Sequence, residues 1–323
     1  MGSSTSFAIG CLVQWYEVDI IKEYVDSLKS ALQNYTGEVH VDMKLVMNQQ
    51  LEKTSMTKDE FEDVERRVFN MFYELQQYCN GGLVFVDIRQ DLYTIADYRR
   101  EFNTNFCVHA DVLIWGESDM LLPKPMFVVL DSLHQSQSIQ TPKYLATFSG
   151  CKMWDESWKP LEHVDFTDKP FIENDYDNWW SVKYTMSQEE MNTVNEKVEE
   201  LQVSVVAPHK FNGCGLVISS EVIKAGVNIP KSVFFVHEDT SFMLMTQKIL
   251  GNIPQYHFKN ILLVHNRNHP NKRMYVKEEV GDTLNQKRRS NEWYIKANKY
   301  CEENCYNIFN PAYKAKTWKD VLQ

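Results

Sequence analysis

Two acidic side chains separated by one residue follow an apolar stretch near the middle of the chain. Residues 111–115 predict a buried strand, and Glu117 and Asp119 come directly after it. Because open α/β sheets bind ligands at the carboxyl ends of their strands, both carboxylates are expected at that edge. Oxygen ligands suit Mg²⁺ or Mn²⁺ on a diphosphate, although a solvated acidic turn explains this short pattern equally well.

A second pair of acids, Glu238 and Asp239, follows the apolar residues 233–236 and precedes a helix predicted to run to residue 250. Such acids commonly cap a helix and interact favourably with its dipole. A carboxylate beside an acceptor hydroxyl can also accept its proton while a new bond forms. The sequence leaves both interpretations open, and the functional one is a general base.

A histidine and several basic residues are the third group of candidate site residues. His265 ends the predicted strand 261–265, and Arg267, Lys272 and Arg273 follow it. An imidazole beside acids can be a metal ligand, and Arg or Lys can neutralise phosphate. An ordinary histidine followed by a solvated basic surface has the same pattern, so only the combination with the acids points to a site.

The elements that position these side chains alternate along the chain. Strands are predicted at 7–13, 39–46 and 83–86, and helices with one apolar face at 20–32, 58–78 and 93–108. Alternation of this kind indicates an α/β fold with a mostly parallel central sheet flanked by helices. The strand ends are therefore the places where ligand-binding residues are expected.

The amino-acid composition limits the classes of protein to which this chain can belong. The 323 residues are 43% hydrophobic, enough for a large core, and no apolar run of about 18 residues predicts a membrane span. The short polar start predicts no signal peptide, and the odd count of seven cysteines suits a reducing compartment, so a cytoplasmic protein is expected. The net charge of −10 argues against attraction of the whole molecule to nucleic acid, although residues 259–299 are locally basic.

In their order along the chain, these motifs resemble the family 2 glycosyltransferases of the GT-A (Rossmann-like) fold. The resemblance covers roughly residues 7–130 and 207–275. It is carried by the loop after the first strand, the helix before the acidic motif, that motif, the later acidic pair and the histidine: Gln14, Tyr16, Glu17, Arg99, Arg100, Asn103, Glu117, Asp119, Glu238, Asp239 and His265.

The resemblance implies a metal-dependent transfer of a sugar from a nucleotide-sugar donor, a UDP-sugar, to a hydroxyl group. It implies Mn²⁺ or Mg²⁺ held by Asp119, Glu117 and His265, with Asp239 and Glu238 as the catalytic acids. The residues implied or proposed for the donor are Gln14, Tyr16, Glu17, Asn48, Arg99, Arg100, Arg267, Lys272 and Arg273. Two positions differ from the family pattern, because Glu117 stands for the first Asp of the motif and Asn48 for the Asp after the second strand.

The implied organisation has four parts. Residues 1–130 form the nucleotide-sugar-binding half of a GT-A domain, 131–206 an elaboration with loops on the acceptor side, 207–275 the acceptor and catalytic half, and 276–323 a basic C-terminal extension. The residues around Trp15 and Trp115 also resemble glycosyltransferases of tailed bacteriophages. That resemblance implies a hydroxymethylated base such as hydroxymethylcytosine in double-stranded phage DNA as the acceptor, and the host cytoplasm as the location.

Other classes of function stay open. A glycan or protein acceptor fits the same chemistry, and a non-catalytic nucleotide- or sugar-binding protein on the same scaffold fits the two departures at Glu117 and Asn48. A Rossmann-type phosphate-binding enzyme is disfavoured, because Gly10 stands alone and no glycine-rich fingerprint follows the first strand. The oligomeric state is not predicted.

Overall fold

A computed structural model describes residues 4–51, 56–136, 142–150, 163–164, 187–206, 211–265 and 291–323. The elements are β1 (Phe7–Gln14), η1 (Trp15–Glu17), α1 (Ile21–Gln33), β2 (Val39–Val46), α2 (Lys58–Tyr73), η2 (Glu74–Tyr78), β3 (Val84–Arg89), α3 (Ile95–Phe106), β4 (Val112–Trp115), β5 (Met120–Leu121), α4 (Met126–Gln135), β6 (Leu145–Gly150), α5 (Gln188–Asn195), β7 (Val203–Val205), β8 (Val217–Ser219), α6 (Ser220–Lys224), α7 (Glu238–Leu250), β9 (Gln255–His265), α9 (Glu292–Tyr306) and α10 (Trp318–Leu322). In this described part of the chain, no helix combines the length and apolar character needed to cross a membrane.

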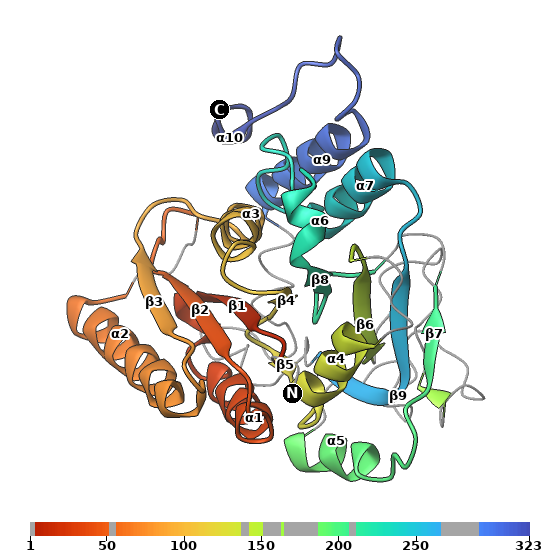
Figure 1. Ribbon diagram of the computed structural model, residues 1–323. Helices are drawn as coiled ribbons and strands as arrows, with labels where there is room; N and C mark the ends of the chain where they lie inside the picture. Colours follow the sequence, from red (N-terminus) through yellow and green to blue (C-terminus); the bar gives the residue numbers. More distant parts are fainter. Residues whose placement is uncertain are drawn as a thin grey trace.

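A single curled sheet runs through the molecule (Figure 1). Its strand order is β3-β2-β1-β4-β8-β6-β9-β5, with β7 paired to β9. The strands β1 to β4 are parallel, because each is joined to the next by a helix that crosses over the sheet. Beyond β4 the strands are no longer all parallel, and β8 runs antiparallel to both β4 and β6.

The α/β fold predicted from the sequence is confirmed, but the prediction of a mostly parallel sheet holds only for its first half. The sheet is mixed, since β9 is parallel to β6 and antiparallel to both β5 and β7. The sheet also continues through β6, which lies within the range 131–206 that we predicted to be an elaboration. Its short sequence, LATFSG, carries too little periodicity to identify a central strand.

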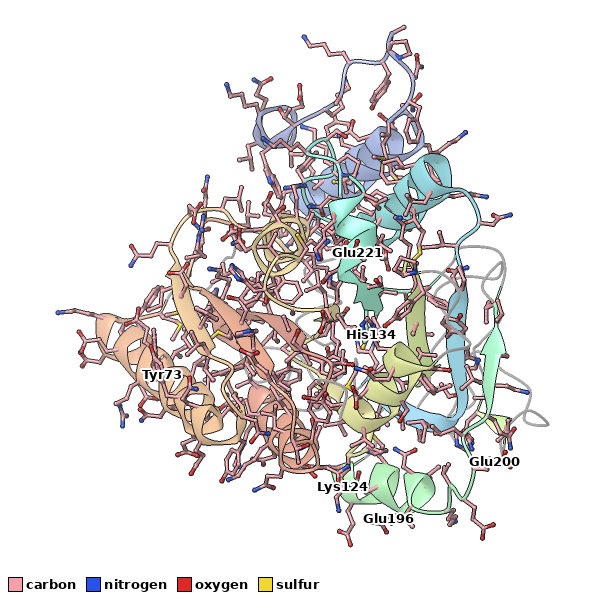
Figure 2. The ribbon with its side chains drawn as sticks, in the orientation of Figure 1. Tyr73, Lys124, His134, Glu196, Glu200 and Glu221 are labelled. Carbon is pink, nitrogen blue, oxygen red and sulfur yellow. The ribbon has the colours of Figure 1, made fainter. Side chains whose placement is uncertain are left out.

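Alternate residues of β1 face two layers of helices. Phe7, Ile9 and Cys11 belong to the core cluster that also contains buried residues of α1, α2 and α4. Ala8 and Leu12 belong to a second cluster with α3, α6 and α7. This two-residue period is what a strand buried on both faces requires. In Figure 2, Tyr73 on α2 and Glu221 on α6 mark helices on opposite sides of the sheet.

Helix starts are specified locally. Thr57 and Glu60 at α2, Thr94 and Asp97 at α3, and Ser187 and Glu190 at α5 each form a reciprocal capping box. In each pair the side chains satisfy backbone N–H groups that have no partner within the helix.

Near the C-terminal end of α4, His134 contacts the residue before β6. It lies near the centre of the view in Figure 2, and its Nδ1 is 2.9 Å from the hydroxyl of Tyr144, which immediately precedes β6.

The C-terminal helices α9 and α10 pack on the segment that leads into α7. Their aromatic and small apolar side chains form a cluster with Phe234 and Phe235. Asn304 of α9 adds hydrogen bonds from its Nδ2 to the carbonyl oxygens of Ser232 (2.7 Å) and Lys316 (2.9 Å). The start of α7 is therefore supported by residues from the end of the chain.

Asp42 is a carboxylate enclosed by this packing. It lies in β2, only 4% exposed, and the Tyr98 hydroxyl of α3 donates a 3.1 Å hydrogen bond to its backbone oxygen. Burial raises the pKa of the Asp42 carboxyl to about 6, and Lys44 and Tyr98 oppose this shift only in part. The unfolded chain, in contrast, ionises this side chain near its ordinary value.

This difference predicts a loss of stability as the pH rises. Between about pH 4 and pH 6 the folded state binds more protons at Asp42 than the unfolded state, so the free energy of unfolding falls. We expect Asp42→Asn, which cannot ionise, to lack this loss and to gain up to about 3 kcal/mol relative to the unaltered protein between about pH 4 and pH 7. Denaturant unfolding at both pH values measures the gain.

The matched control is Asp63→Asn on α2, where the side chain is 44% exposed and lies away from Asp42. We expect this variant to follow the pH dependence of the unaltered protein. If Asp42→Asn also followed it, the burial of an unfavourable charge at Asp42 would be excluded.

Candidate functional site

The segment after β4 and the last residue of β9 meet at one edge of the sheet. The short strand β5 pairs with β9 and places Met120 opposite His265. This pairing brings His265 Nε2 to 2.9 Å from Glu117 Oε2 and 3.4 Å from Asp119 Oδ1. The three residues predicted as metal ligands thus lie together, although β9 is far from β4 in the sequence.

These side chains are shielded from water and electrostatically coupled. The side chains of Asp119 and His265 are only 4% and 6% exposed, and that of Glu117 is 23% exposed. Burial alone would lower the pKa of His265, but Asp119 and Glu117 raise it above its ordinary value. Burial would raise the pKa of Glu117, but His265 and Arg99 outweigh it and lower this pKa to about 2. The pocket therefore favours a positive charge between two carboxylates.

The separations from His265 to Glu117 and to Asp119 are short enough for ligands of one divalent cation, although Asp119 is not in the group of described residues whose ligand atoms all lie within 4.8 Å of one another. Ligands about 2.1 Å from an octahedral cation stand about 3.0 Å from their neighbours, close to the 2.9 and 3.4 Å separations found here. Among the described residues, Glu117, Cys214 and His265 offer ligand atoms that all lie within 4.8 Å of one another. Carboxylate oxygen, imidazole nitrogen and thiol sulfur are all established metal ligands.

Arg99 of α3 connects this acidic edge to α7. Its Nη2 donates to Glu117 Oε1 at 2.7 Å, and its Nη1 donates to Glu238 Oε1 at 2.5 Å. The same Nη2 also donates to the carbonyl oxygen of Gly213 at 3.1 Å. The side chain is 1% exposed, so these contacts pair a fully buried charge, while its Nε has no hydrogen-bond partner among the described residues. The buried guanidinium fixes the two acidic motifs relative to each other.

The Arg99 guanidinium also packs against an aromatic ring. Its Cζ lies 4.7 Å from the centre of the Trp115 ring, a cation–π contact, and Trp115 Nε1 donates to Asn103 Oδ1 at 2.8 Å. Trp115 is the last residue of β4, two positions before Glu117. The same strand therefore supplies an acid that pairs with Arg99 and the ring that packs against it.

Glu238 and Asp239 occupy the first turn of α7. His237 before them adopts a left-handed conformation with φ of 65°, which turns the chain sharply into the helix. Asp239 Oδ2 accepts the N–H of Gly213 at 3.2 Å, and its Oδ1 accepts the N–H of Thr240 at 2.7 Å. Burial and the neighbouring Asp239 raise the pKa of Glu238, and Arg99 opposes them. Glu238 faces the interior, whereas Asp239 is half-buried.

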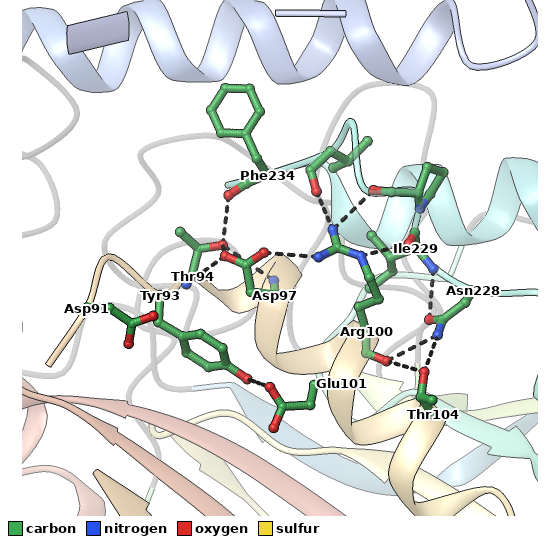
Figure 3. A network of polar contacts seen from close by, with 12 residues as sticks. Asp91, Tyr93, Thr94, Asp97, Arg100, Glu101, Thr104, Asn228, Ile229 and Phe234 are labelled. Atoms are coloured by element: carbon green, nitrogen blue, oxygen red, sulfur yellow. Dashed lines mark hydrogen bonds and ion pairs between the residues drawn. The ribbon is translucent and has the colours of Figure 1, made fainter. Parts of the chain in front are cut away.

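Arg100 has a different set of contacts, drawn in Figure 3. Its guanidinium donates to the carbonyl oxygens of Ile229 (2.9 Å), Pro230 (3.1 Å) and Val233 (2.6 Å), and to Asp97 Oδ1 (2.9 Å). Thr94 Oγ1 donates to the carbonyl oxygen of Phe234 at 2.8 Å in the same network. These bonds hold residues 229–234, and so the approach to α7, against α3.

Four of the other residues predicted at the donor site, Gln14, Tyr16, Glu17 and Asn48, lie at the ends of β1 and β2. Tyr16 is buried, and Glu17 Oε2 accepts the backbone N–H of Gln14 at 2.9 Å. Asn48 donates from Nδ2 to the carbonyl oxygen of Gln90 at 2.8 Å and accepts the N–H of Gln50 at 3.0 Å. These contacts shape the loops after the two strands, as expected for the ligand edge of a parallel sheet. Arg267, Lys272 and Arg273 lie outside the described residues.

Sequence analysis did not identify the loop between residues 211 and 216 as part of the site. Gly213 contacts both Arg99 and Asp239 through its backbone, and Cys214 joins the possible metal ligands. The signal available in the sequence was Gly213-Cys214-Gly215, a cysteine between two glycines immediately before β8. Glycines in such a position indicate a backbone with unusual torsion angles or close contacts.

No protein-family model and no curated protein sequence matches this chain. Among solved structures, it is similar to residues 1–349 of S. aureus TarS, with 10% identity and a TM-score of 0.47 over 98% of this chain and 77% of that one. The TarS complex with UDP-GlcNAc gives 10% identity and a TM-score of 0.49 over 98% and 70% of the two chains. The glycosyltransferase GlyE of Streptococcus pneumoniae TIGR4 gives 10% and 0.31 over 99% and 60%. At this level of similarity no function transfers, so we take the function from the side chains of the site.

Proposed function

We propose that this protein is a metal-dependent glycosyltransferase that uses a nucleotide-sugar donor. The observation that carries the proposal is the convergence of Glu117, Asp119 and His265 at one sheet edge, with Glu238 of α7 joined to them through Arg99. A cation site and a candidate base at the ligand edge of an α/β sheet suit transfer from a diphosphate leaving group. The motif order seen in the sequence supports the same assignment.

Glu117, Asp119 and His265 would hold the divalent cation, Mn²⁺ or Mg²⁺ in the simplest case. When bound, such an ion neutralises charge on the donor diphosphate and so stabilises the departing nucleotide. The protein contributes a shielded pocket, since Asp119 and His265 are almost fully buried. In such a pocket, electrostatic interactions are stronger than in water.

Asp239 is the better placed of the two α7 acids to act as a base. It is half-buried and accepts the backbone N–H groups of Gly213 and Thr240, which fix the orientation of its carboxylate. In the proposed step the acceptor oxygen forms a bond to the anomeric carbon, the bond from that carbon to the diphosphate oxygen breaks, and the hydroxyl proton passes to Asp239. The nucleoside diphosphate carries away the bonding electron pair.

Glu238 and Arg99 are positioning residues in this scheme. The 2.5 Å contact between Arg99 Nη1 and Glu238 Oε1 fixes the first turn of α7. The contact of Arg99 Nη2 with Glu117 links that turn to the cation site. A displacement of about 1 Å in such an arrangement costs on the order of 10²-fold in rate.

Ligand binding gives the first test of the proposal. A ligand that binds only the folded state raises the melting temperature, so we would screen UDP, other nucleoside diphosphates and UDP-GlcNAc, the ligand of one TarS structure, with and without Mn²⁺. Metal-dependent stabilisation by one nucleotide supports the donor site and identifies its base. A non-catalytic binding protein would show the same stabilisation but release no UDP from the donor.

The acceptor is tested after the donor is known. DNA containing hydroxymethylcytosine is the acceptor implied by the sequence, and glycans and peptides with free hydroxyl groups are the alternatives. Transfer of labelled sugar to one of these three classes assigns the acceptor. Replacing Lys287, Arg288 and Arg289, three basic residues of the stretch 259–299, by glutamine then shows whether that stretch contributes to DNA modification.

Removing one carboxylate should uncouple donor binding from metal. We expect Asp119→Asn, which keeps the size of the side chain, to weaken Mn²⁺ binding by at least about tenfold and to abolish the metal-dependent part of UDP binding. Calorimetric titration with Mn²⁺ and then UDP measures both. Asp87→Asn on β3 is the control and should bind both ligands normally. Unchanged metal-dependent UDP binding in Asp119→Asn would refute the cation assignment.

Removing the proposed base should affect turnover and not binding. We expect Asp239→Asn to bind Mn²⁺ and UDP like the unaltered protein but to release UDP from the donor about 10²-fold more slowly. Steady-state UDP release with donor and acceptor gives the rate, and Asp63→Asn on the exposed face of α2 is the control. A turnover equal to that of the control would exclude Asp239 as the base.

A further inference from the structure

Cys214 lies at the cation site, yet the proposed mechanism does not use it. Its sulfur, a Glu117 carboxylate oxygen and a His265 ring nitrogen lie within 4.8 Å of one another. The residue is 5% exposed and forms no disulfide. Cys214 packs within the core cluster that contains Phe7, as a buried cysteine commonly does, but a carboxylate and an imidazole lie beside its sulfur as well.

The loop that carries Cys214 is constrained on both sides. A Cβ atom on Gly213 would lie 2.0 Å from Arg99 Nη1, so only glycine fits beside the guanidinium. Gly215 has φ of +69°, and a Cβ there would lie 2.5 Å from Leu263 Cδ1. The backbone conformation and close approach explain both glycines, and together they fix the residue between them.

Hydrogen bonds fix the same loop to β4. The N–H of Cys214 donates to Asn212 Oδ1 at 3.0 Å, and the N–H of Gly215 donates to the carbonyl oxygen of Trp115 at 2.9 Å. The N–H of Trp115 in turn donates to the carbonyl oxygen of Leu216 at 2.9 Å. Cys214 is therefore held against the strand whose end supplies Glu117.

We propose that Cys214 is a thiolate ligand of the cation held by Glu117 and His265, and that the site consequently prefers a sulfur-accepting ion such as Zn²⁺ or Co²⁺ to Mg²⁺. This inference rests on the cation site of the proposed function and specifies its ion. On binding, the S–H bond of Cys214 breaks, the proton leaves to solvent, and the sulfur donates an electron pair to the ion. Thiolate ligands suit these transition ions, whereas Mg²⁺ takes oxygen ligands.

Cobalt provides the direct test, because a thiolate bound to Co²⁺ adds an intense near-ultraviolet charge-transfer absorption to the weak visible bands. We expect this absorption in the unaltered protein and its loss in Cys214→Ser, with Co²⁺ and Zn²⁺ affinity weakened by at least about tenfold and Mg²⁺ affinity unchanged. Cys107→Ser, a substitution of another buried cysteine at the end of α3, is the matched control and should keep the absorption.

The outcomes separate this inference from the proposed function. Co²⁺ binding without the charge-transfer absorption overturns Cys214 coordination and leaves the cation site standing. Failure of Co²⁺, Zn²⁺, Mn²⁺ and Mg²⁺ to bind overturns both the inference and the metal dependence of the proposed function. Should Cys214→Ser not fold, X-ray absorption of the Zn²⁺-loaded unaltered protein decides the matter: one sulfur at about 2.3 Å supports coordination, and a shell of only nitrogen and oxygen overturns it.

Discussion

The arrangement of the site depends on one buried positive charge. The Arg99 guanidinium is 1% exposed and donates to Glu117, Glu238 and the Gly213 carbonyl, so it joins the end of β4, the loop before β8 and the start of α7. A buried charge is tolerated only when it is paired and hydrogen-bonded, and removing one partner of such a pair typically costs about 3–5 kcal/mol. Each of these segments is therefore restrained by the requirement to neutralise the same side chain.

The charges around Arg99 are unequal, and this inequality has a functional consequence. Within the described part of the chain, the carboxylates of Glu117, Asp119, Glu238 and Asp239 are grouped with one guanidinium and one imidazole, Arg99 and His265. With Arg99 and His265 charged, the negative excess is two if all four acids are ionised and one if Glu238, whose pKa is raised by burial, is protonated. A divalent cation would balance this excess, and its binding would be strengthened by the low exposure of the ligands. The carboxylates themselves repel anions, so only a bound ion would attract a negatively charged ligand to this edge.

The sheet brings these groups to one place through two different kinds of connection. Helical crossovers make β1 to β4 parallel, so the loops after β1, β2 and β4 emerge at the same edge. Beyond β4 the sheet is mixed, and the short antiparallel pairing of β5 with β9 returns His265 to the end of β4. Below this edge, Arg100 and the helices α9 and α10 hold the segment that leads into α7. The groups proposed for catalysis and cation binding therefore lie on a framework that is connected at several points.

Much of this protein is determined locally by its sequence. The range predicted for the second strand, 39–46, matches β2 (Val39–Val46), and the helix predicted at 20–32 differs from α1 (Ile21–Gln33) by one residue at each end, because buried strands and amphipathic helices have clear periods and caps. The types of residue at the site, Glu117, Asp119, Glu238, Asp239 and His265, were equally readable from their positions after strands and before a helix. Three features could not be read from the sequence: the position of β6 within the sheet, the antiparallel direction of β8, and the place of Cys214 among the possible metal ligands. Each depends on contacts between segments that are distant along the chain. The same holds for Arg99, whose role as a buried link between two acids exists only once α3, β4 and α7 have packed together, since burial and pairing are properties of the assembled core and not of any local sequence.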